Sequence, residues 1–365
     1  MKQLAAAAAL SIAAVLSALS PVQAQEKVVH VYNWSDYIDP KVLEDFTKET
    51  GIKVVYDVYD KNETVEAKLL AGKSGYDIVT PSATFLQRFA EQKLLKPLDN
   101  AKLSNLKNQM PEMQKNIAVY DPGNKHAVPY MWGTVGIGVN VKKVKDALGD
   151  VPLNTWDLLL DPKLIGKLKS CGVHVLDAPE DVFPAALRAL KIDPNTKKAE
   201  DFRKASAALV KIRGNIRKFH SSEYINALAN GDICMAVGYS GDVLQAKKRA
   251  EEAKNGVEIA YIIPREGAQV AIDSFAIPAD APHPEEAHAF INFMLRPDIA
   301  ARNVNVVAFA SANLAAKAQI KPEIVADKGV YPDDATFARL FTIVSYDDKL
   351  QKVVTREWTR VTTGK

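Results

Sequence analysis

From Val28 onward the sequence alternates short apolar runs with longer amphipathic stretches, and this alternation leaves few folds open to the chain. Apolar runs such as residues 52–58 have the length of strands, and amphipathic stretches such as residues 40–50 have the length of helices. Gly51 and Gly72 follow two of these stretches, where glycine commonly ends a helix. Because strands that alternate with helices form parallel sheets covered by helices, we expect an α/β fold.

The length of 365 residues suits two packed lobes better than one. Residues 127–139 contain three glycines separated by apolar residues, in neither a dinucleotide nor a P-loop spacing, so we interpret them as a strand that leaves one lobe and enters the other. Residues 272–278 are predicted to be a returning strand. A cleft between two such lobes is a natural site for a small ligand. The predicted division gives 25–132 and 261–303 to lobe 1, and 133–260 and 304–365 to lobe 2.

The first residues have the pattern of a secretory signal peptide. Met1 and Lys2 precede an apolar run over residues 4–19, and the small-residue site Val22-Gln23-Ala24 follows. The run is short for a membrane span. We predict a signal peptide over residues 1–24 and an exported, periplasmic protein that begins near Gln25.

The two cysteines take their meaning from this predicted export. In an oxidising compartment Cys171 and Cys234 are expected to pair. A catalytic or metal-bound cysteine is the alternative, although no CxxC or His-Cys spacing accompanies them. The formal net charge of +3 argues against nucleic acid as a partner, which would favour a concentrated basic face.

Catalytic motifs are poorly represented. Residues 238–242 approach a nucleophile elbow, but Asp242 stands where that motif needs its last glycine. The six histidines, at positions 30, 126, 174, 220, 283 and 288, show no paired metal spacing. We therefore expect neither an enzyme nor a bound metal or cofactor.

Aromatic and acidic residues recur at the predicted carboxyl ends of strands, where open α/β sheets hold ligands. Trp34, Ser35, Asp36 and Tyr37 follow the first strand. Flat aromatic faces beside a carboxylate suit an organic cation with an alkyl body. The alternative, that the two rings are core and Asp36 is a helix cap, stays open on these residues alone.

Similar residues follow other predicted strands. Tyr239 and Asp242 come after the strand that holds Cys234, and Asp273 lies near the returning strand. Ser82 follows a third strand, where it could cap the next helix, contact a ligand, or do both. Carboxylates and aromatic rings that face one cleft would attract a cation, because unpaired buried charges are costly.

These segments resemble the periplasmic putrescine- and spermidine-binding proteins of bacterial ABC uptake systems, and most of all the putrescine-binding type. The resemblance covers nearly the whole mature chain and rests on six segments in matching order: Tyr32–Ile38, Gly75–Val79, Pro129–Thr134, Phe219–Ser222, Asn230–Cys234 and Tyr239–Asp242. It implies a type II-like periplasmic binding fold with a hinge between mainly parallel α/β lobes. It also implies a monomer that delivers polyamine to an inner-membrane permease with a cytoplasmic ATPase.

The resemblance also assigns roles to residues. It implies that Trp34, Tyr37 and Tyr239 line the cleft, that Ser35 and Ser82 orient the ligand, that Asp36 binds one ammonium end and that Asp242 and Asp273 bind the other. It likewise implies the Cys171–Cys234 disulfide.

Three ligand-binding positions depart from the family pattern. Ala271 replaces a large aromatic residue, Asp181 replaces a glutamate, and Phe309 replaces a tyrosine. These changes are expected to enlarge the cleft and to remove an aromatic wall, so the ligand is putrescine or a bulkier, related amine. Alternatives are another cationic or zwitterionic solute, an amine-sensing role, or a secreted enzyme. An amino acid ligand would need an arginine partner, and the candidate segments contain none.

Overall fold

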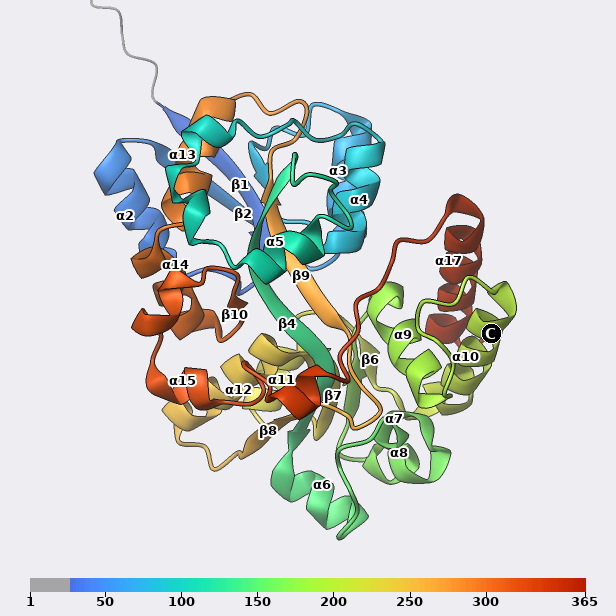
Figure 1. The fold of residues 1–365 in the computed structure, drawn as a ribbon. Coiled ribbons are helices and arrows are strands. Elements are labelled where there is room, and N and C mark those ends of the chain that lie inside the picture. The colour runs from blue at the N-terminus through green and yellow to red at the C-terminus, as the bar shows by residue number, and fades with distance from the viewer. Residues whose placement is uncertain (1–26) are drawn as a thin grey trace, which may run out of the picture.

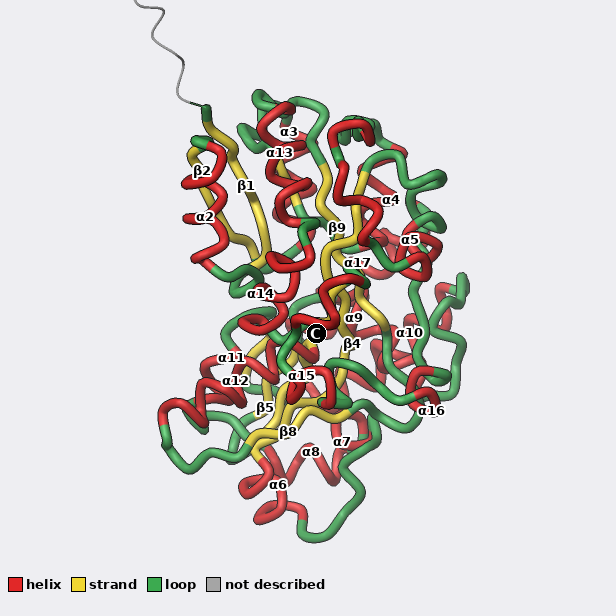
Figure 2. Tube along the Cα trace, turned by 60° about the vertical axis from the view of Figure 1, so that its left-hand side comes forward, coloured by secondary structure: helices red, strands yellow, loops and turns green. Residues whose placement is uncertain are grey.

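The computed structural model describes residues 27–365, which form two α/β lobes (Figures 1 and 2). The predicted signal peptide, residues 1–24, and the predicted start at Gln25 lie outside the described residues. In both views each lobe has strands inside and helices outside, which confirms the predicted fold class. Among the described residues, no helix is both long and apolar enough to cross a membrane.

The strands follow one path through both lobes, in the order β2-β1-β3-β9-β4-β7-β5-β6, and β8 and β10 also pair with β4. Their bounds are β1 Val28–Trp34, β2 Lys53–Tyr59, β3 Ile78–Val79, β4 Ala127–Asn140, β5 Val173–Val175, β6 Lys218–Phe219, β7 Met235–Tyr239, β8 Ile259–Ile262, β9 Val270–Ala276 and β10 Ala310–Ser311. In lobe 1, β1, β2 and β3 are parallel, and in lobe 2, β5, β6 and β7 are parallel. Every antiparallel pairing among these strands involves β4 or β9.

The crossing strand predicted over residues 127–139 is β4, which is buried along its whole length and belongs to both lobes (Figure 1). Its first half pairs with β9 and β10 in lobe 1. Its second half pairs with β7 and β8 in lobe 2. A single strand therefore sets how the two sheets face each other.

Helices cover both faces of the lobe 1 sheet: α2 and α13 on one face, α3 and α4 on the other (Figure 1). The helices of lobe 1 and its extensions are α2 Pro40–Thr50, α3 Asn62–Ala71, α4 Ala83–Glu91, η2 Asn100–Lys102, η3 Ser104–Asn108, α5 Pro111–Ile117, α13 Pro284–Met294, α14 Pro297–Val307, η5 Ala315–Gln319 and α15 Pro322–Ala326. Those of lobe 2 and the final crossing are α6 Val141–Leu148, α7 Asp157–Leu160, α8 Pro162–Leu168, α9 Pro179–Ala189, α10 Ala199–Ile212, η4 Arg213–Asn215, α11 Tyr224–Ala229, α12 Ser240–Ala253, α16 Asp334–Phe337 and α17 Asp348–Thr363.

The helix predicted over residues 40–50 illustrates why the local sequence was informative. It begins at Pro40, whose fixed φ suits the first helical position, and the Asp39 side chain accepts a hydrogen bond from the Lys41 backbone. It ends at Gly51, which is left-handed with φ of 70°. These local signals specify both ends, and α14 adds tertiary contacts at the first one, where the Asp39 N–H donates to Asn303 at 2.9 Å and Arg302 pairs with the Asp39 carboxylate.

The predicted disulfide is confirmed. Cys171 and Cys234 are bonded, with their Cα atoms 5.5 Å apart. Cys171 lies two residues before β5, and Cys234 directly precedes β7. Strands β5 and β7 are neighbours in the sheet. The bridge therefore ties together two parallel strands of lobe 2.

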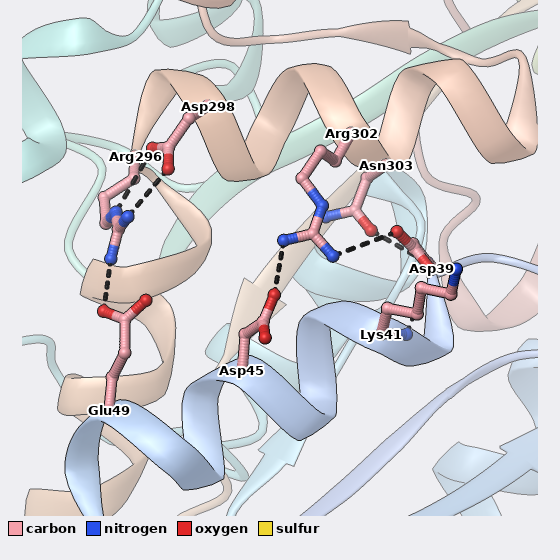
Figure 3. Close-up of polar contacts among 8 residues, drawn as sticks. All are labelled: Asp39, Lys41, Asp45, Glu49, Arg296, Asp298, Arg302 and Asn303. Atoms are coloured by element: carbon pink, nitrogen blue, oxygen red, sulfur yellow. Dashed lines mark hydrogen bonds and ion pairs between the residues drawn. The ribbon is translucent and has the colours of Figure 1, made fainter.

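Packing of α14 bears on the predicted lobe boundaries. Arg302 on α14 forms ion pairs with Asp45 (2.6 Å) and Asp39 (3.4 Å), at α2 of lobe 1 (Figure 3). Val304 and Val307 lie in the same buried cluster as β1. We propose that lobe 1 extends beyond the predicted boundary at residue 303, and that the chain crosses to lobe 2 only before α17, which packs against α9 and α10.

Candidate ligand-binding site

A cleft between the lobes contains about 840 Å³ of space that protein atoms do not fill, part of it open to solvent. The carboxyl ends of β1 and β2 and the residues that follow β3 line it from lobe 1, and those that follow β7 line it from lobe 2. This placement agrees with the general position of ligands in open α/β sheets.

Ten of the eleven predicted site residues line this cleft. They are Trp34, Ser35, Tyr37, Ser82, Asp181, Tyr239, Asp242, Ala271, Asp273 and Phe309. The fold brings them together from six separate stretches of chain, although their roles toward a ligand stay a prediction.

Asp36 is the exception, and its predicted contact with an ammonium group is not supported by this geometry. Its φ of 56° is left-handed, and it is not among the residues that line the cleft. Its carboxylate instead pairs with Arg249 on α12 of lobe 2, at 2.6 Å, with both side chains partly exposed. Gln245, also on α12, donates to the Asp36 carbonyl at 3.1 Å. Asp36 thus joins the two lobes beside the cleft.

Three aspartates in the cleft each accept a hydrogen bond from a tyrosine hydroxyl. Tyr37 donates to Asp273 at 2.8 Å. Tyr224 donates to Asp242 at 2.5 Å. Tyr239 donates to Asp181 at 2.6 Å, and the second Asp181 oxygen accepts from Gln269 at 2.9 Å. A hydroxyl orients a carboxylate but brings no positive charge, so the three sites stay anionic when ionised.

Burial raises the pKa of each of these carboxylates. The pKa of Asp181 and of Asp242 rises to about 7, and that of Asp273 to about 6, because burial disfavours the charged form. The tyrosine hydrogen bonds offset part of this effect. Among the described residues that line the cleft there is no Lys, Arg or His. A bound cation would supply the missing positive charge.

Aromatic rings form much of the remaining wall. Trp34 packs against Tyr59 with ring centroids 4.5 Å apart, and its indole N–H donates to the Thr80 carbonyl at 2.8 Å. That hydrogen bond fixes the indole ring at the cleft wall.

Phe309 packs edge-on against Tyr37 and also closes on lobe 2 at Gly241. A Cβ atom at Gly241 would lie 2.0 Å from the Phe309 ring, so only glycine permits this approach. The smaller ring of Phe309, without a hydroxyl, is therefore packed rather than loose.

Ser82 does not cap α4 with its side chain, contrary to the simpler of its two predicted roles. Its hydroxyl instead accepts a hydrogen bond from Asn62 at 3.0 Å, and its backbone N–H donates to the same side chain at 3.2 Å. Asn62 also lines the cleft. The Ser82 side chain also hydrogen-bonds to the Asp273 carboxylate, which offsets part of the rise in the pKa of that aspartate.

The sequence interpretation missed several lining residues. Tyr59 and Asp60 lie where β2 ends, and the rule that ligands gather at strand ends would have found them. Glu180 also lines the cleft, but its oxygens face Thr84 (2.8 Å) and Arg88 (3.3 Å) of lobe 1. No local pattern predicts that pairing, since the partners lie more than ninety residues earlier.

Two α/β lobes joined by a shared strand, with an anionic, aromatic cleft between them, define a solute-binding protein. The comparisons with known proteins agree. Residues 41–332 match the family model described as "Bacterial extracellular solute-binding protein". The chain belongs to this family, whose members bind solutes rather than catalyse reactions.

Relatives match over nearly their full length. The chain is 51% identical to the "Putrescine-binding periplasmic protein PotF" of Escherichia coli strain K12, over 97% of each chain. It is 38% identical to a "Putrescine/agmatine-binding protein" of Pseudomonas aeruginosa, over 98% of each. Its fold is similar to a solved "Putative spermidine/putrescine ABC transporter from Listeria monocytogenes", with a TM-score of 0.83, 30% identity, and coverage of 93% of this chain and 100% of that one.

Proposed function

We propose that this protein captures a polyamine in the periplasm and delivers it to an ABC uptake permease driven by a cytoplasmic ATPase. The observation that carries the proposal is the cleft with three tyrosine-bound aspartates, of which Asp242 and Asp273 are buried, and with no basic side chain among the described residues of its lining. Buried charges need partners, and an alkyl ammonium ion is a partner of the right sign.

As a ligand for this cleft, the aromatic walls favour an amine with a carbon chain rather than a metal ion or a simple ammonium ion. Trp34, Tyr59 and Tyr239 offer flat faces that cover methylene groups and attract cations. Burying each methylene contributes about 0.8 kcal/mol. The relatives whose names specify putrescine, agmatine or spermidine point in the same direction.

Three positions in the cleft affect which amine binds most tightly. Ala271 leaves space where the resembled family has a large ring, and Asp181 and Phe309 also line the cleft. We propose that the site accepts putrescine but binds a bulkier or longer amine more tightly.

A thermal-shift screen followed by calorimetry tests this function. Putrescine, cadaverine, agmatine, spermidine and spermine are compared with arginine and glutamate, since binding to the folded state raises apparent stability. We expect shifts with amines and none with glutamate, because the described lining residues include no cation for its carboxylates. Stabilisation by glutamate but by no amine would contradict the proposal.

The cellular setting completes the proposal. We propose a periplasmic monomer with no nucleic-acid partner, as the predicted signal peptide and the near-neutral charge suggest. Light scattering with and without amine checks the monomer. Uptake of labelled amine by cells that carry the permease, with and without this protein, separates transport from sensing.

A further inference from the structure

A second cluster of polar side chains lies in lobe 1, away from the cleft. His30 is on β1, four residues before Trp34, so it is about 13 Å along the strand from the cleft end. Asp77 directly precedes β3, and His283 directly precedes α13. Three segments far apart in sequence therefore meet at the amino-terminal end of these strands.

The two imidazoles converge on one carboxylate oxygen. Nδ1 of His30 lies 3.2 Å from Asp77 Oδ2, and Nδ1 of His283 lies 3.1 Å from the same oxygen. The three potential ligand atoms all lie within 4.8 Å of one another. Tetrahedral Zn²⁺ with bonds of about 2.0–2.1 Å needs ligand atoms roughly 3.3 Å apart, which is close to the two nitrogen–oxygen distances.

The surrounding backbone fixes the carboxylate. The His30 N–H donates to Asp77 Oδ2 at 2.8 Å, and the His283 N–H donates to Oδ1 at 2.6 Å. His283 stands between Pro282 and Pro284, which restrict the backbone on both sides. A ligand set that is held in place before binding favours a metal ion, and metal-binding carboxylates are usually hydrogen-bonded in this way.

Exposure also fits a metal ion. The Asp77 side chain is fully buried, while the side chains of His30 and His283 are 29% and 28% exposed. A buried carboxylate favours a cationic partner, and the open imidazole side gives water access to complete the coordination.

We propose that His30, Asp77 and His283 form a binding site for one divalent transition-metal ion of the Zn²⁺ type. Two imidazole nitrogens and one carboxylate oxygen suit Zn²⁺, Co²⁺, Ni²⁺ or Cu²⁺, whereas Ca²⁺ and Mg²⁺ prefer oxygen ligands throughout. The ion would tie β1, the start of β3 and the start of α13 together. This site is separate from the cleft and does not depend on the proposed polyamine function.

The alternative is that each imidazole donates its Nδ1 hydrogen to Asp77 and that no metal binds. Asn variants separate the two, because the Asn side-chain amide can still donate near the Nδ1 position but binds metal poorly. His126 provides a matched control: its Nδ1 lies 2.8 Å from Asp121, whose buried carboxylate also accepts the His126 backbone N–H. That pair has one histidine where the proposed site has two.

The experiment uses untagged protein stripped of metal with a chelator. Titration with ZnCl₂ in a calorimeter should give one ion per chain, and Co²⁺ should give visible absorption bands of a low-coordinate nitrogen–oxygen site. His30→Asn and His283→Asn should each weaken Zn²⁺ binding by at least about a hundredfold, the upper end of what loss of a mere supporting contact costs. His126→Asn should leave it unchanged.

Circular dichroism of each variant checks folding, and the thermal shift of wild type on adding Zn²⁺, reversed by chelator, gives a readout that needs no variant. The proposal is overturned if the wild type binds no Zn²⁺ or shows no shift. It is equally overturned if His283→Asn binds as tightly as the wild type, since binding would then lie elsewhere.

Discussion

Replacing Asp242 by Asn should change ligand binding and stability in opposite directions. The Asp242 side chain is buried, and its carboxylate accepts the Tyr224 hydroxyl. An ammonium ion bound there would lose its charged partner in Asp242→Asn. Breaking a buried charge pair costs about 2–5 kcal/mol. At roughly 3 kcal/mol, the affinity for a diamine falls about a hundredfold, using 1.4 kcal/mol per decade.

The stability effect follows from the raised pKa of Asp242. Its pKa rises from 3.8 to about 7 on folding, mainly because of burial. The folded state therefore binds this proton more tightly than the unfolded chain does. That contribution to stability is fully present below pH 3.8 and is lost as the pH rises through 7. Three pKa units correspond to at most about 4 kcal/mol.

Asn carries no charge at any pH and can still accept the Tyr224 hydrogen bond. Ligand-free Asp242→Asn should accordingly be more stable than wild type at pH 8, with a smaller difference at pH 5. Calorimetric titration measures the affinity, and urea denaturation at both pH values measures the free energy of unfolding.

Asp36→Asn is the matched control, because Asp36 also follows a strand but pairs with Arg249 outside the cleft lining. Exposed ion pairs contribute about 0–1 kcal/mol, so its affinity should change less than about fivefold. The reasoning is refuted if Asp36→Asn weakens binding as much as Asp242→Asn. It is also refuted if ligand-free Asp242→Asn is less stable than wild type at pH 8.

Three further predictions concern the cleft and the disulfide. Ala271→Phe should strengthen putrescine binding about tenfold, or 1.4 kcal/mol, by adding a ring face, and should weaken a bulkier amine; titrations with putrescine and spermine check this, and tight, putrescine-only binding by wild type with no gain in the variant contradicts it. Amine affinity should be weaker at pH 5 than at pH 8, because the cleft carboxylates with a pKa of about 6 to about 7 are protonated at low pH; equal affinities at both pH values would argue against these carboxylates as ligands. Replacing Cys171 and Cys234 by Ser should lower the free energy of unfolding by about 4 kcal/mol, from a loop closed over a separation of 63 residues; intact-mass analysis of unreduced protein should find no thiol to alkylate, and two alkylated thiols would refute the bridge.

Local signals made much of the fold predictable. The helix at 40–50 has its cap, its first-turn proline and its final glycine in sequence, and its bounds match those of α2. The crossing strand at 127–139 was recognisable because apolar residues fill it continuously, as expected for a strand buried on both faces. The predicted lobe division depended on where the chain crosses from lobe 1 to lobe 2 after β9. That position depends on how α14 packs in the folded protein, which no local pattern in the sequence indicates.

The site was predictable where residue type and strand end coincided, as for Tyr37, Asp242 and Asp273. Asp36 has the same two properties, yet a left-handed backbone and a partner 213 residues away turn its carboxylate to Arg249. Glu180 similarly depends on Arg88 of the other lobe. Such pairings join residues that only the finished fold brings together, so no local pattern reveals them.

The position of β9 between β3 and β4 has a consequence for the order in which the chain can fold. The strands of the lobe 2 sheet all lie between residues 127 and 262, a single contiguous piece. The lobe 1 sheet needs strands from residues 28 to 311, and its β3 and β4 are joined in the sheet order only through β9. Distant pairings form slowly because the connecting loop must first be closed. When the chain emerges amino-terminus first, we expect the lobe 2 sheet to form before the lobe 1 sheet, although lobe 1 contains the earlier residues and α17 joins lobe 2 last.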